Sequence, residues 1–267
     1  MDTSLKNTAL ITGASSGIGA IYADRLASRG HDLILVARNR ERLDSLAARI
    51  TNDTGRSVEV IVADLNNRAD LARVEQVLRT DATITVLVNN AGIAMFGDLA
   101  NADPDRLESM IQLNVLAPTL LALAAIPGFV VRGSGTLINI SSVLALAPEW
   151  FNGSYSGTKA YLLNLSLRLQ QEVASKGVRV QVVLPGATRT AIWEKAGIDI
   201  ATLPPSMLMD VDKMVDAALV GLDRGESVTI PSLPEIADWE AYEAARQNMI
   251  PKLSLHSPAV RYSITAT

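Results

Sequence analysis

Short apolar runs alternate with longer amphipathic segments along most of the chain. The apolar runs have the composition of strands that are buried on both faces of a sheet. They fall at Thr8–Thr12, Asp32–Ala37, Val58–Ala63, Thr85–Val88, Gly135–Ser141, Val178–Leu184 and Ser227–Ile230. Helical segments lie between them, at Gly17–Ser28, Arg40–Ile50, Arg68–Arg79, Pro104 to about Val130, Tyr155–Ser175 and Val211–Leu222. This alternation predicts an α/β fold, a doubly wound parallel sheet of about seven strands with helices on both faces.

The pattern continues without a repeat or a low-complexity linker, so residues 1–267 are predicted to form a single domain. Prolines punctuate the tail 231–267, which could dock or swing. The longest apolar run, Leu113–Val131, is nearly as long as the roughly 20 residues that cross a membrane. Polar and helix-breaking residues interrupt this run, so we expect a buried helix with no membrane partner.

Composition narrows the possible chemistry. Of the 267 residues, 48% are hydrophobic and 19% are charged, which is enough apolar material for a full core. The net charge of -4 does not favour a nucleic-acid partner. The absence of cysteine excludes disulfides and thiolate catalysis, and two histidines are too few for a histidine-rich metal site. These counts predict a protein with no bound metal. Because the polar start Met1–Asn7 is not a secretory signal, we expect a cytoplasmic protein.

A glycine-rich turn joins the first predicted strand to the first helix. It reads Thr12-Gly13-Ala14-Ser15-Ser16-Gly17-Ile18-Gly19. The first glycine permits a tight turn, and the others let the backbone and the helix N-terminus approach a pyrophosphate. An ordinary strand-to-helix turn is the alternative. The position of the turn in the first strand–helix unit favours dinucleotide binding.

The chain resembles the compact, single-domain branch of the short-chain dehydrogenase/reductase family. The resemblance rests on landmarks in order and at family-like spacing, and it extends from Thr12 to Thr190. They are the glycine turn, Asp64, Asn89-Asn90-Ala91-Gly92, Asn114, Ser142, Tyr155, Lys159 and Pro185-Gly186. The resemblance implies a Rossmann-type sheet and an oxidoreductase that uses a nicotinamide cofactor. No comparably sharp motif follows Thr190.

The end of the second strand indicates which nicotinamide cofactor is used. A dinucleotide site for NAD often has an acid at this point, where it binds the ribose hydroxyl. Here Ala37 stands at that position and Arg38 follows. A guanidinium offers a planar fork of donors to a 2′-phosphate, so we predict NADP(H). Arg38 could instead face solvent at the strand end, and Arg42 is more typical of a surface helix charge.

The family resemblance implies the remaining cofactor contacts. Asp64 would meet the adenine amino group and Leu65 would pack beside the ring. Asn90 and the small residues after it would form a backbone wall along the cofactor ribose, and Lys159 would hold the nicotinamide ribose. Thr190 would hold the carboxamide through its hydroxyl and Thr188 through its backbone. Asp64 could also be the N-cap of the next helix, and the asparagine stretch could be an ordinary turn. The full predicted set is Gly13, Ser15, Ser16, Gly17, Ile18, Gly19, Arg38, Asp64, Leu65, Asn90, Ala91, Gly92, Tyr155, Lys159, Pro185, Gly186, Thr188 and Thr190.

Tyr155 and Lys159 are four residues apart on a predicted helix, so their side chains share one face. Tyrosine can protonate a developing alkoxide, but its ordinary pKa near 10 is high for neutral pH. Lowering that pKa by about three units takes roughly 4 kcal/mol. A lysine cation about 4 Å away supplies a similar energy at an effective dielectric of about 20. Ser142, just past the fifth strand, would orient the carbonyl by an oxyanion-type hydrogen bond.

Asn114 resembles the fourth catalytic member of the family. Pro118 stands four residues later and has no N–H, so it cannot bond to the Asn114 carbonyl. That carbonyl would then be available to a water that starts a proton relay toward Lys159. Alternatively, Pro118 only kinks a packing helix.

Aromatic and large apolar residues cluster in the segments expected to line the substrate pocket. They are Met95, Phe96, Leu144, Trp150, Phe151 and Trp193. Such a pocket favours a neutral, apolar carbonyl substrate over a charged one, although some of these residues could pack loops or an interface instead.

Three readings of the activity remain open from the sequence. The first is an NADPH-dependent carbonyl reductase, which includes the reduction of 3-oxoacyl thioesters. The second is an NADP(H)-sensing regulator on the same fold, and a sugar epimerase is a more remote third. Residues 191–209 are predicted to form a mobile lid over the site, with a fixed surface helix as the alternative. Family members commonly pair through the two helices around Leu113–Val131 and after Tyr155, so we expect a homodimer or homotetramer.

Overall fold

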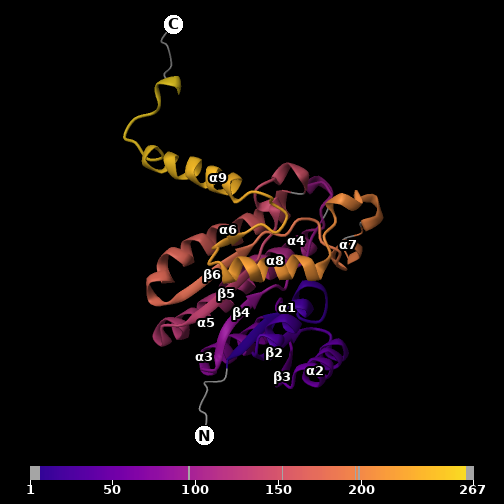
Figure 1. Cartoon of the computed structure of the whole chain (residues 1–267). Coiled ribbons are helices and arrows are strands. Elements are labelled where there is room, and N and C mark those ends of the chain that lie inside the picture. The colour runs from indigo at the N-terminus through magenta and orange to yellow at the C-terminus, as the bar shows by residue number, and fades with distance from the viewer. Residues whose placement is uncertain (1–6, 96, 152, 196, 198, 263–267) are drawn as a thin grey trace. The chain divides into compact units, whose positions relative to one another are not determined.

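Seven parallel strands form one sheet in the order β3-β2-β1-β4-β5-β6-β7 (Figure 1). In this computed structural model, the structure describes residues 7–95, 97–151, 153–195, 197 and 199–262. The strands are β1 (Thr8–Thr12), β2 (Asp32–Ala37), β3 (Val58–Val62), β4 (Ile84–Asn89), β5 (Gly135–Ile140), β6 (Val178–Val183) and β7 (Val228–Thr229). The strand order reverses between β1 and β4, and this is where open α/β sheets bind ligands.

Helices cover both faces of the sheet. The helices that the structure describes are α1 (Gly17–Ser28), α2 (Arg40–Thr54), α3 (Arg68–Thr80), α4 (Pro104–Ile111), α5 (Ala117–Arg132), α6 (Gly153–Val173), α7 (Ile192–Lys195), α8 (Val211–Asp223) and, in a separate unit, α9 (Ile236–Met249). One buried cluster joins the sheet to α1, α2 and α8, and a second joins it to α3, α5 and α6. The predicted doubly wound sheet is therefore confirmed.

The long helix predicted from Pro104 to about Val130 is divided in the structure. A π-helical turn over Gln112–Leu116 separates α4 from α5. The turn is closed by the Ala117 N–H, which donates to the Gln112 carbonyl five residues earlier. Pro118 supplies no N–H to the ordinary ladder, which is the physical reason for the interruption. The predicted helical region is therefore present, but it is not one continuous α-helix.

Residues 104–132 together are long and apolar enough to cross a membrane, by length and composition alone. Leu121, Ala125 and Phe129 are nevertheless buried in the cluster between the sheet, α3 and α5. The apolar character of α5 is thus explained on one side by the protein core, as the sequence predicted.

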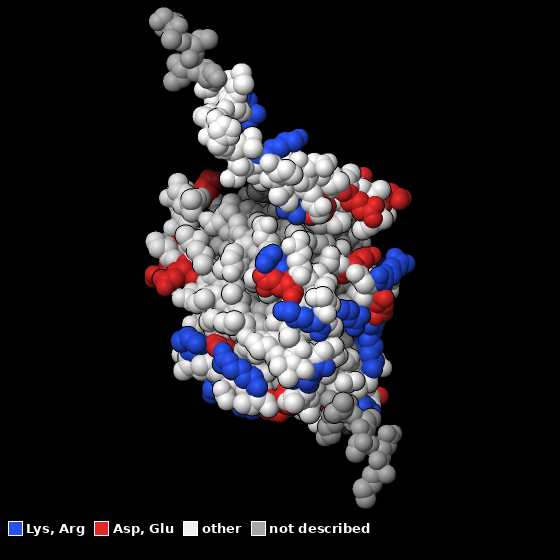
Figure 2. Space-filling view, turned by 90° about the vertical axis from the view of Figure 1, so that its left-hand side faces the viewer, with Lys and Arg blue, Asp and Glu red and all other residues white. Residues whose placement is uncertain are grey.

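The outer side of α5 keeps large apolar side chains exposed, and Leu123 is 62% exposed. Figure 2 shows a broad uncharged area between groups of charged side chains on the face it presents.

We therefore expect a homodimer or homotetramer by light scattering at micromolar concentration. Leu123→Glu should shift the protein toward the monomer, because association would bury the new carboxylate.

Val220→Glu is the matched control for this prediction. Val220 is also an exposed apolar residue, but it lies on α8, which covers the opposite face of the sheet. A wild-type monomer, or equal shifts in the two variants, would contradict an interface on α5.

The chain divides into two compact units, Met1–Pro231 and Ser232–Thr267. The second unit contains α9, which the proline-punctuated sequence did not predict. Trp239 and Tyr242 stack on each other along α9, with ring centroids 5.5 Å apart.

Candidate active site

In the glycine turn between β1 and α1, Gly13 and Gly19 lie too close to neighbouring atoms to carry a side chain. Gly13 has φ +65°, and a Cβ there would lie 2.8 Å from Asn90 Nδ2. A Cβ on Gly19 would lie 2.5 Å from the Gly13 carbonyl oxygen. A Cβ on Gly17 would lie 3.4 Å from Thr190 Cγ2, so the turn after β6 comes close to the glycine turn. Together these approaches leave bare backbone at the strand ends, the form of cradle that a dinucleotide requires.

The N-terminus of α1 is oriented for an anion. The N-cap residue Ser16 makes no side-chain hydrogen bond to the first turn of α1 in the part of the chain that the structure describes. The N–H groups of that turn are then satisfied by solvent or by a ligand, and the helix dipole favours a negative group. The glycine turn therefore fits a pyrophosphate.

Asn90 fixes the shape of the turn. Its side-chain Nδ2 donates to the carbonyls of Thr12 at 3.0 Å and Gly13 at 3.2 Å. The Thr12 hydroxyl in turn accepts from the N–H groups of Asn90 at 3.0 Å and Ala91 at 3.1 Å. Asn90, whose backbone was predicted to line the cofactor ribose, thus holds the glycine turn in place through its side chain.

Arg38 and Asp64 face each other at the ends of β2 and β3. Arg38 Nη1 lies 3.9 Å from Asp64 Oδ2, and both side chains are exposed. Helix α3 is capped by Asn67, whose side chain accepts from the N–H groups of Ala69 and Asp70. The alternative that Asp64 serves as this N-cap is therefore wrong. Arg38 remains a cation at the edge of the cradle with only a loose surface partner.

Tyr155 and Lys159 both lie on α6, as their spacing predicted, and both side chains are buried. Lys159 Nζ lies 5.8 Å from the centre of the Tyr155 ring and donates to the Ile140 carbonyl at 3.0 Å. The Ser141 hydroxyl donates to the Lys159 carbonyl at 2.7 Å. The end of β5 therefore fixes both the side-chain ammonium group and the backbone carbonyl of Lys159. Sequence reasoning missed Ser141, which lies beside the predicted Ser142.

Ser142 follows directly after β5 and is buried. Its hydroxyl oxygen accepts from the Leu144 N–H at 3.1 Å. This bond caps a short helical turn and fixes the orientation of the serine side chain.

Asn114 lies in the π-helical turn, and both the oxygen and the nitrogen of its side-chain amide make hydrogen bonds. Its Oδ1 accepts from the Ile93 N–H at 3.0 Å, and its Nδ2 donates to the Ile93 carbonyl at 2.9 Å. The same Nδ2 donates to the Thr158 hydroxyl at 3.1 Å, and that hydroxyl donates to the Tyr155 carbonyl at 2.7 Å. Thr158, which sequence reasoning also missed, therefore links Asn114 to the turn of α6 that carries Tyr155.

Burial shifts the pKa values of the pair in opposite directions. It raises the pKa of Tyr155 above its ordinary value of 10, and it lowers the pKa of Lys159 to about 8. The sequence predicted that Lys159 lowers the pKa of Tyr155, whereas burial of the phenol sets the direction of the shift in the structure. Lys159 is still mostly protonated at pH 7.

This lysine pKa predicts a falling limb in the pH profile of carbonyl reduction. The protonated amine is present below about pH 8 and is lost as the pH rises through that value. The quantity kcat/KM for the nicotinamide cofactor should fall there, because it reports groups of the free enzyme. Lys159→Arg, if active, should lose this limb because a guanidinium stays charged. A limb that persists in Lys159→Arg would assign it to another group.

Most of the predicted pocket residues come together beside Tyr155. Met95 and Leu144 share a buried cluster with Tyr155, and Phe151 packs against that cluster. The Trp193 ring lies 6.2 Å from the Phe151 ring at an angle of 57°. Trp150, by contrast, is 65% exposed and lies outside the cluster, and Phe96 lies outside the described residues.

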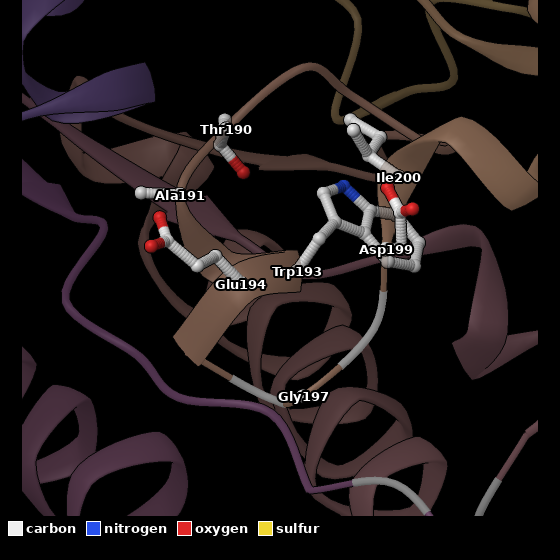
Figure 3. Close-up of a pocket in the computed structure, with 7 residues that line it drawn as sticks. All are labelled: Thr190, Ala191, Trp193, Glu194, Gly197, Asp199 and Ile200. Atoms are coloured by element: carbon white, nitrogen blue, oxygen red, sulfur yellow. The ribbon is translucent and has the colours of Figure 1, made fainter.

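A cavity of about 480 Å³ opens beside this cluster (Figure 3). Thr190 and Trp193 line it together with Ala191, Glu194, Gly197, Asp199 and Ile200. The two carboxylates were not predicted, and they would repel an anionic ligand.

The turn after β6 is tied to the start of α8. The Met209 N–H donates to the Ala187 carbonyl at 2.9 Å, and the Arg189 N–H donates to the Met209 carbonyl at 3.0 Å. Arg189 also pairs with Asp210 at 3.2 Å. The two ends of the segment predicted as a lid, 191–209, are therefore held next to each other by these hydrogen bonds. Whether it moves stays a prediction.

Comparison with known proteins gives concordant results. The family model described as short chain dehydrogenase matches residues 7–200. A short-chain dehydrogenase from Sphingobium yanoikuyae, solved in complex with NADPH, is 51% identical and has a TM-score of 0.94. The match covers 96% of this chain and 100% of that one. A bulky-bulky ketone specific alcohol dehydrogenase from Comamonas testosteroni is 44% identical over 97% of this chain and 99% of that one, with a TM-score of 0.89.

Curated relatives are more distant. A very-long-chain 3-oxoacyl-CoA reductase from Anas platyrhynchos is 36% identical over 73% of this chain. Human inactive hydroxysteroid dehydrogenase-like protein 1 is 34% identical over 69% of this chain. The matches span only 64% and 56% of the length of these relatives.

Proposed function

The chain belongs to the short chain dehydrogenase family, and from this premise we propose that it reduces neutral, apolar ketones or aldehydes to alcohols, reversibly, with NADPH. One observation carries the proposal. Tyr155, Lys159, Asn114 and Ser142 lie at the carboxyl ends of β4 and β5, beside a cradle of bare backbone. The apolar cluster around Tyr155 supports a substrate without charge near its carbonyl group.

The cradle residues fit a dinucleotide. The turn from Gly13 to Gly19 would hold the pyrophosphate at the N-terminus of α1, and Arg38 would hold the 2′-phosphate. Asp64 and Leu65 would bind the adenine, and Asn90 to Gly92 would line the ribose. The Sphingobium relative, solved with NADPH, supports this cofactor. NADPH, when bound, supplies the hydride that adds to the carbonyl carbon.

Tyr155 supplies the proton that completes the alcohol. As negative charge develops on the carbonyl oxygen, the phenol O–H bond breaks and its proton is transferred to that oxygen, which leaves a phenolate on Tyr155 and is general-acid catalysis. The hydroxyl oxygen of Ser142 accepts from the Leu144 N–H, so its own O–H is available to donate a hydrogen bond to the same substrate oxygen. The two hydroxyls thereby fix the carbonyl and stabilise the charge that forms there.

Lys159 stabilises the phenolate that remains after proton transfer. Its ammonium group stays close to the Tyr155 ring through the bond to the Ile140 carbonyl. Asn114 aligns this part of the site through Thr158, and its backbone carbonyl in the π-helical turn would hold the first water of the relay that returns a proton to Tyr155. A cation close to the phenolate opposes the effect of burial on the tyrosine pKa.

A substrate panel tests the proposal directly. Purified protein is mixed with NADPH or NADH and a series of aliphatic and aryl ketones, and consumption of the reduced cofactor is followed by absorbance. We expect turnover with NADPH and bulky neutral ketones. NADPH binding without turnover of any carbonyl would instead support the regulatory alternative.

Reduction of 3-oxoacyl thioesters is the second candidate. The 3-oxoacyl-CoA reductase relative favours it, whereas Glu194 and Asp199 at the cavity disfavour the phosphates of coenzyme A. Including a 3-oxoacyl-CoA and a simple 3-oxoacyl ester in the panel separates recognition of the 3-oxoacyl group from repulsion of the coenzyme A phosphates. If the CoA thioester is a better substrate than the neutral ketones, reduction of 3-oxoacyl thioesters replaces ketone reduction as the proposed function.

A further inference from the structure

Trp193 makes a directed hydrogen bond inside the site. Its indole Nε1–H donates to the Thr188 carbonyl at 2.8 Å, and both residues are buried. Figure 3 shows the indole nitrogen directed away from α7, on the side of the ring opposite the helix backbone. Trp193 therefore does more than fill apolar space, because Phe or Leu could pack there without supplying a donor.

The bond completes the hold on the turn after β6. Met209 binds this turn from the side of α8, through the Ala187 carbonyl and the Arg189 N–H. Trp193 binds the Thr188 carbonyl between them, from the side of α7. The Thr188 hydroxyl also donates back to the Gly186 carbonyl at 3.0 Å. Three consecutive residues, 187–189, are thus fixed by Trp193 on α7 and by Met209, which precedes α8.

The same ring reaches the substrate side of the site. Trp193 lies against Phe151, which packs on the cluster that contains Tyr155. One side chain therefore contacts the turn that carries Thr188 and Thr190 and also the stretch between Ser142 and Tyr155. A shift of the indole would alter the distance between these two parts of the site.

We propose that Trp193 is a positioning residue that acts through Thr188: its indole N–H fixes the Thr188 peptide, and thereby the turn that holds the reactive end of the cofactor against the substrate. This inference rests on the proposed function. It assigns the indole nitrogen a task separate from lining a pocket. Without the donor, the buried Thr188 carbonyl loses its partner and the turn relaxes.

The wild-type protein offers a first test that needs no substitution at Trp193. The chain has three tryptophans, so its indole N–H groups give three NMR signals, which Trp150→Phe and Trp239→Phe assign by elimination. In D₂O the Trp193 signal should outlast that of the exposed Trp150 by at least about tenfold, because a buried, bonded N–H exchanges only when its surroundings open. Equal exchange rates would overturn the proposal.

Trp193→Phe is the second test, because it keeps an aromatic ring against Phe151 and removes the donor. Without ligand, the amides of Arg189 and Met209 should exchange faster than in wild type. With NADPH and a ketone, kcat should fall by about tenfold, since small misplacements at a reacting centre are costly. The dissociation constant for NADPH should change by less than about threefold, because Arg38 and the glycine turn are untouched.

Two further variants separate the donor from the ring. Trp193→Leu also lacks the donor, so its amide exchange should match that of Trp193→Phe, while its KM for bulky ketones should change more. Trp239→Phe, on α9, should leave amide exchange and kcat unchanged. Wild-type amide exchange and kcat in Trp193→Phe, with changes only in Trp193→Leu, would show that packing alone matters. The exchange measurements use ligand-free protein, so they can fail while the proposed reduction still holds.

Discussion

Replacing Tyr155 with Phe is expected to reduce kcat for ketone reduction by about 10²–10⁴-fold, the usual contribution of a general acid. The substitution keeps the ring, which packs in the cluster with Met95 and Leu144, and removes only the hydroxyl. NADPH binding should be almost normal, because the cradle and Arg38 do not depend on the phenol. Steady-state kinetics with a responsive ketone and a fluorescence titration with NADPH measure the two quantities.

Tyr22→Phe is a matched control. Tyr22 is also fully buried, but it lies in α1, and its hydroxyl has no hydrogen-bond partner within the described part of the chain. Removing that hydroxyl should leave kcat unchanged and should not lower stability, because an unsatisfied buried hydroxyl is itself a cost. A near wild-type kcat in Tyr155→Phe would refute the assignment of Tyr155 as the acid.

Replacing Arg38 with Ala should reduce the preference for NADPH over NADH by tenfold or more. A charge-assisted hydrogen bond to a phosphate contributes about 1.5–3 kcal/mol, and NADH lacks the 2′-phosphate that would receive it. The loss should therefore appear in kcat/KM for NADPH and be nearly absent for NADH. The preference is measured as the ratio of the two values in wild type and variant.

Arg40→Ala controls for the loss of a surface cation near the same edge. The Arg40 side chain is 67% exposed, as is that of Arg38, and each pairs with a carboxylate at 3.9 Å. Arg40 pairs with Asp44 within α2, so its removal should change the cofactor ratio little. Equal kcat/KM values for NADPH and NADH in wild type would overturn the NADP(H) prediction.

Local patterns were sufficient for a large part of the fold and the site. The two-sided apolar strands, the glycine turn and the four-residue spacing of Tyr155 and Lys159 depend on residues close in sequence. Their consequences, a parallel sheet and a shared helix face, follow from backbone geometry alone. Because they depend only on neighbouring residues and backbone geometry, these predictions agree with the structure.

Other features depend on contacts between residues far apart in the chain. Asn90 holds Gly13 from 77 residues away, and Thr158 meets Asn114 from 44 residues away. The π-helical turn at Asn114, the helix in the tail and the pKa directions of Tyr155 and Lys159 were likewise missed or mistaken. Burial sets those pKa values, and burial is a property of the assembled core.

The sheet, the glycine turn and the residue types of the proposed catalytic group could be predicted from the chain alone, because short-range periodicity and turn chemistry encode them. The contacts by which one side chain holds another in place could be seen only in the folded chain. Trp193 illustrates the difference, since its large apolar ring suggested only a wall of the substrate pocket. Its bond to Thr188 exists only because α7 folds back on the turn after β6, and a directed hydrogen bond depends on that spatial arrangement.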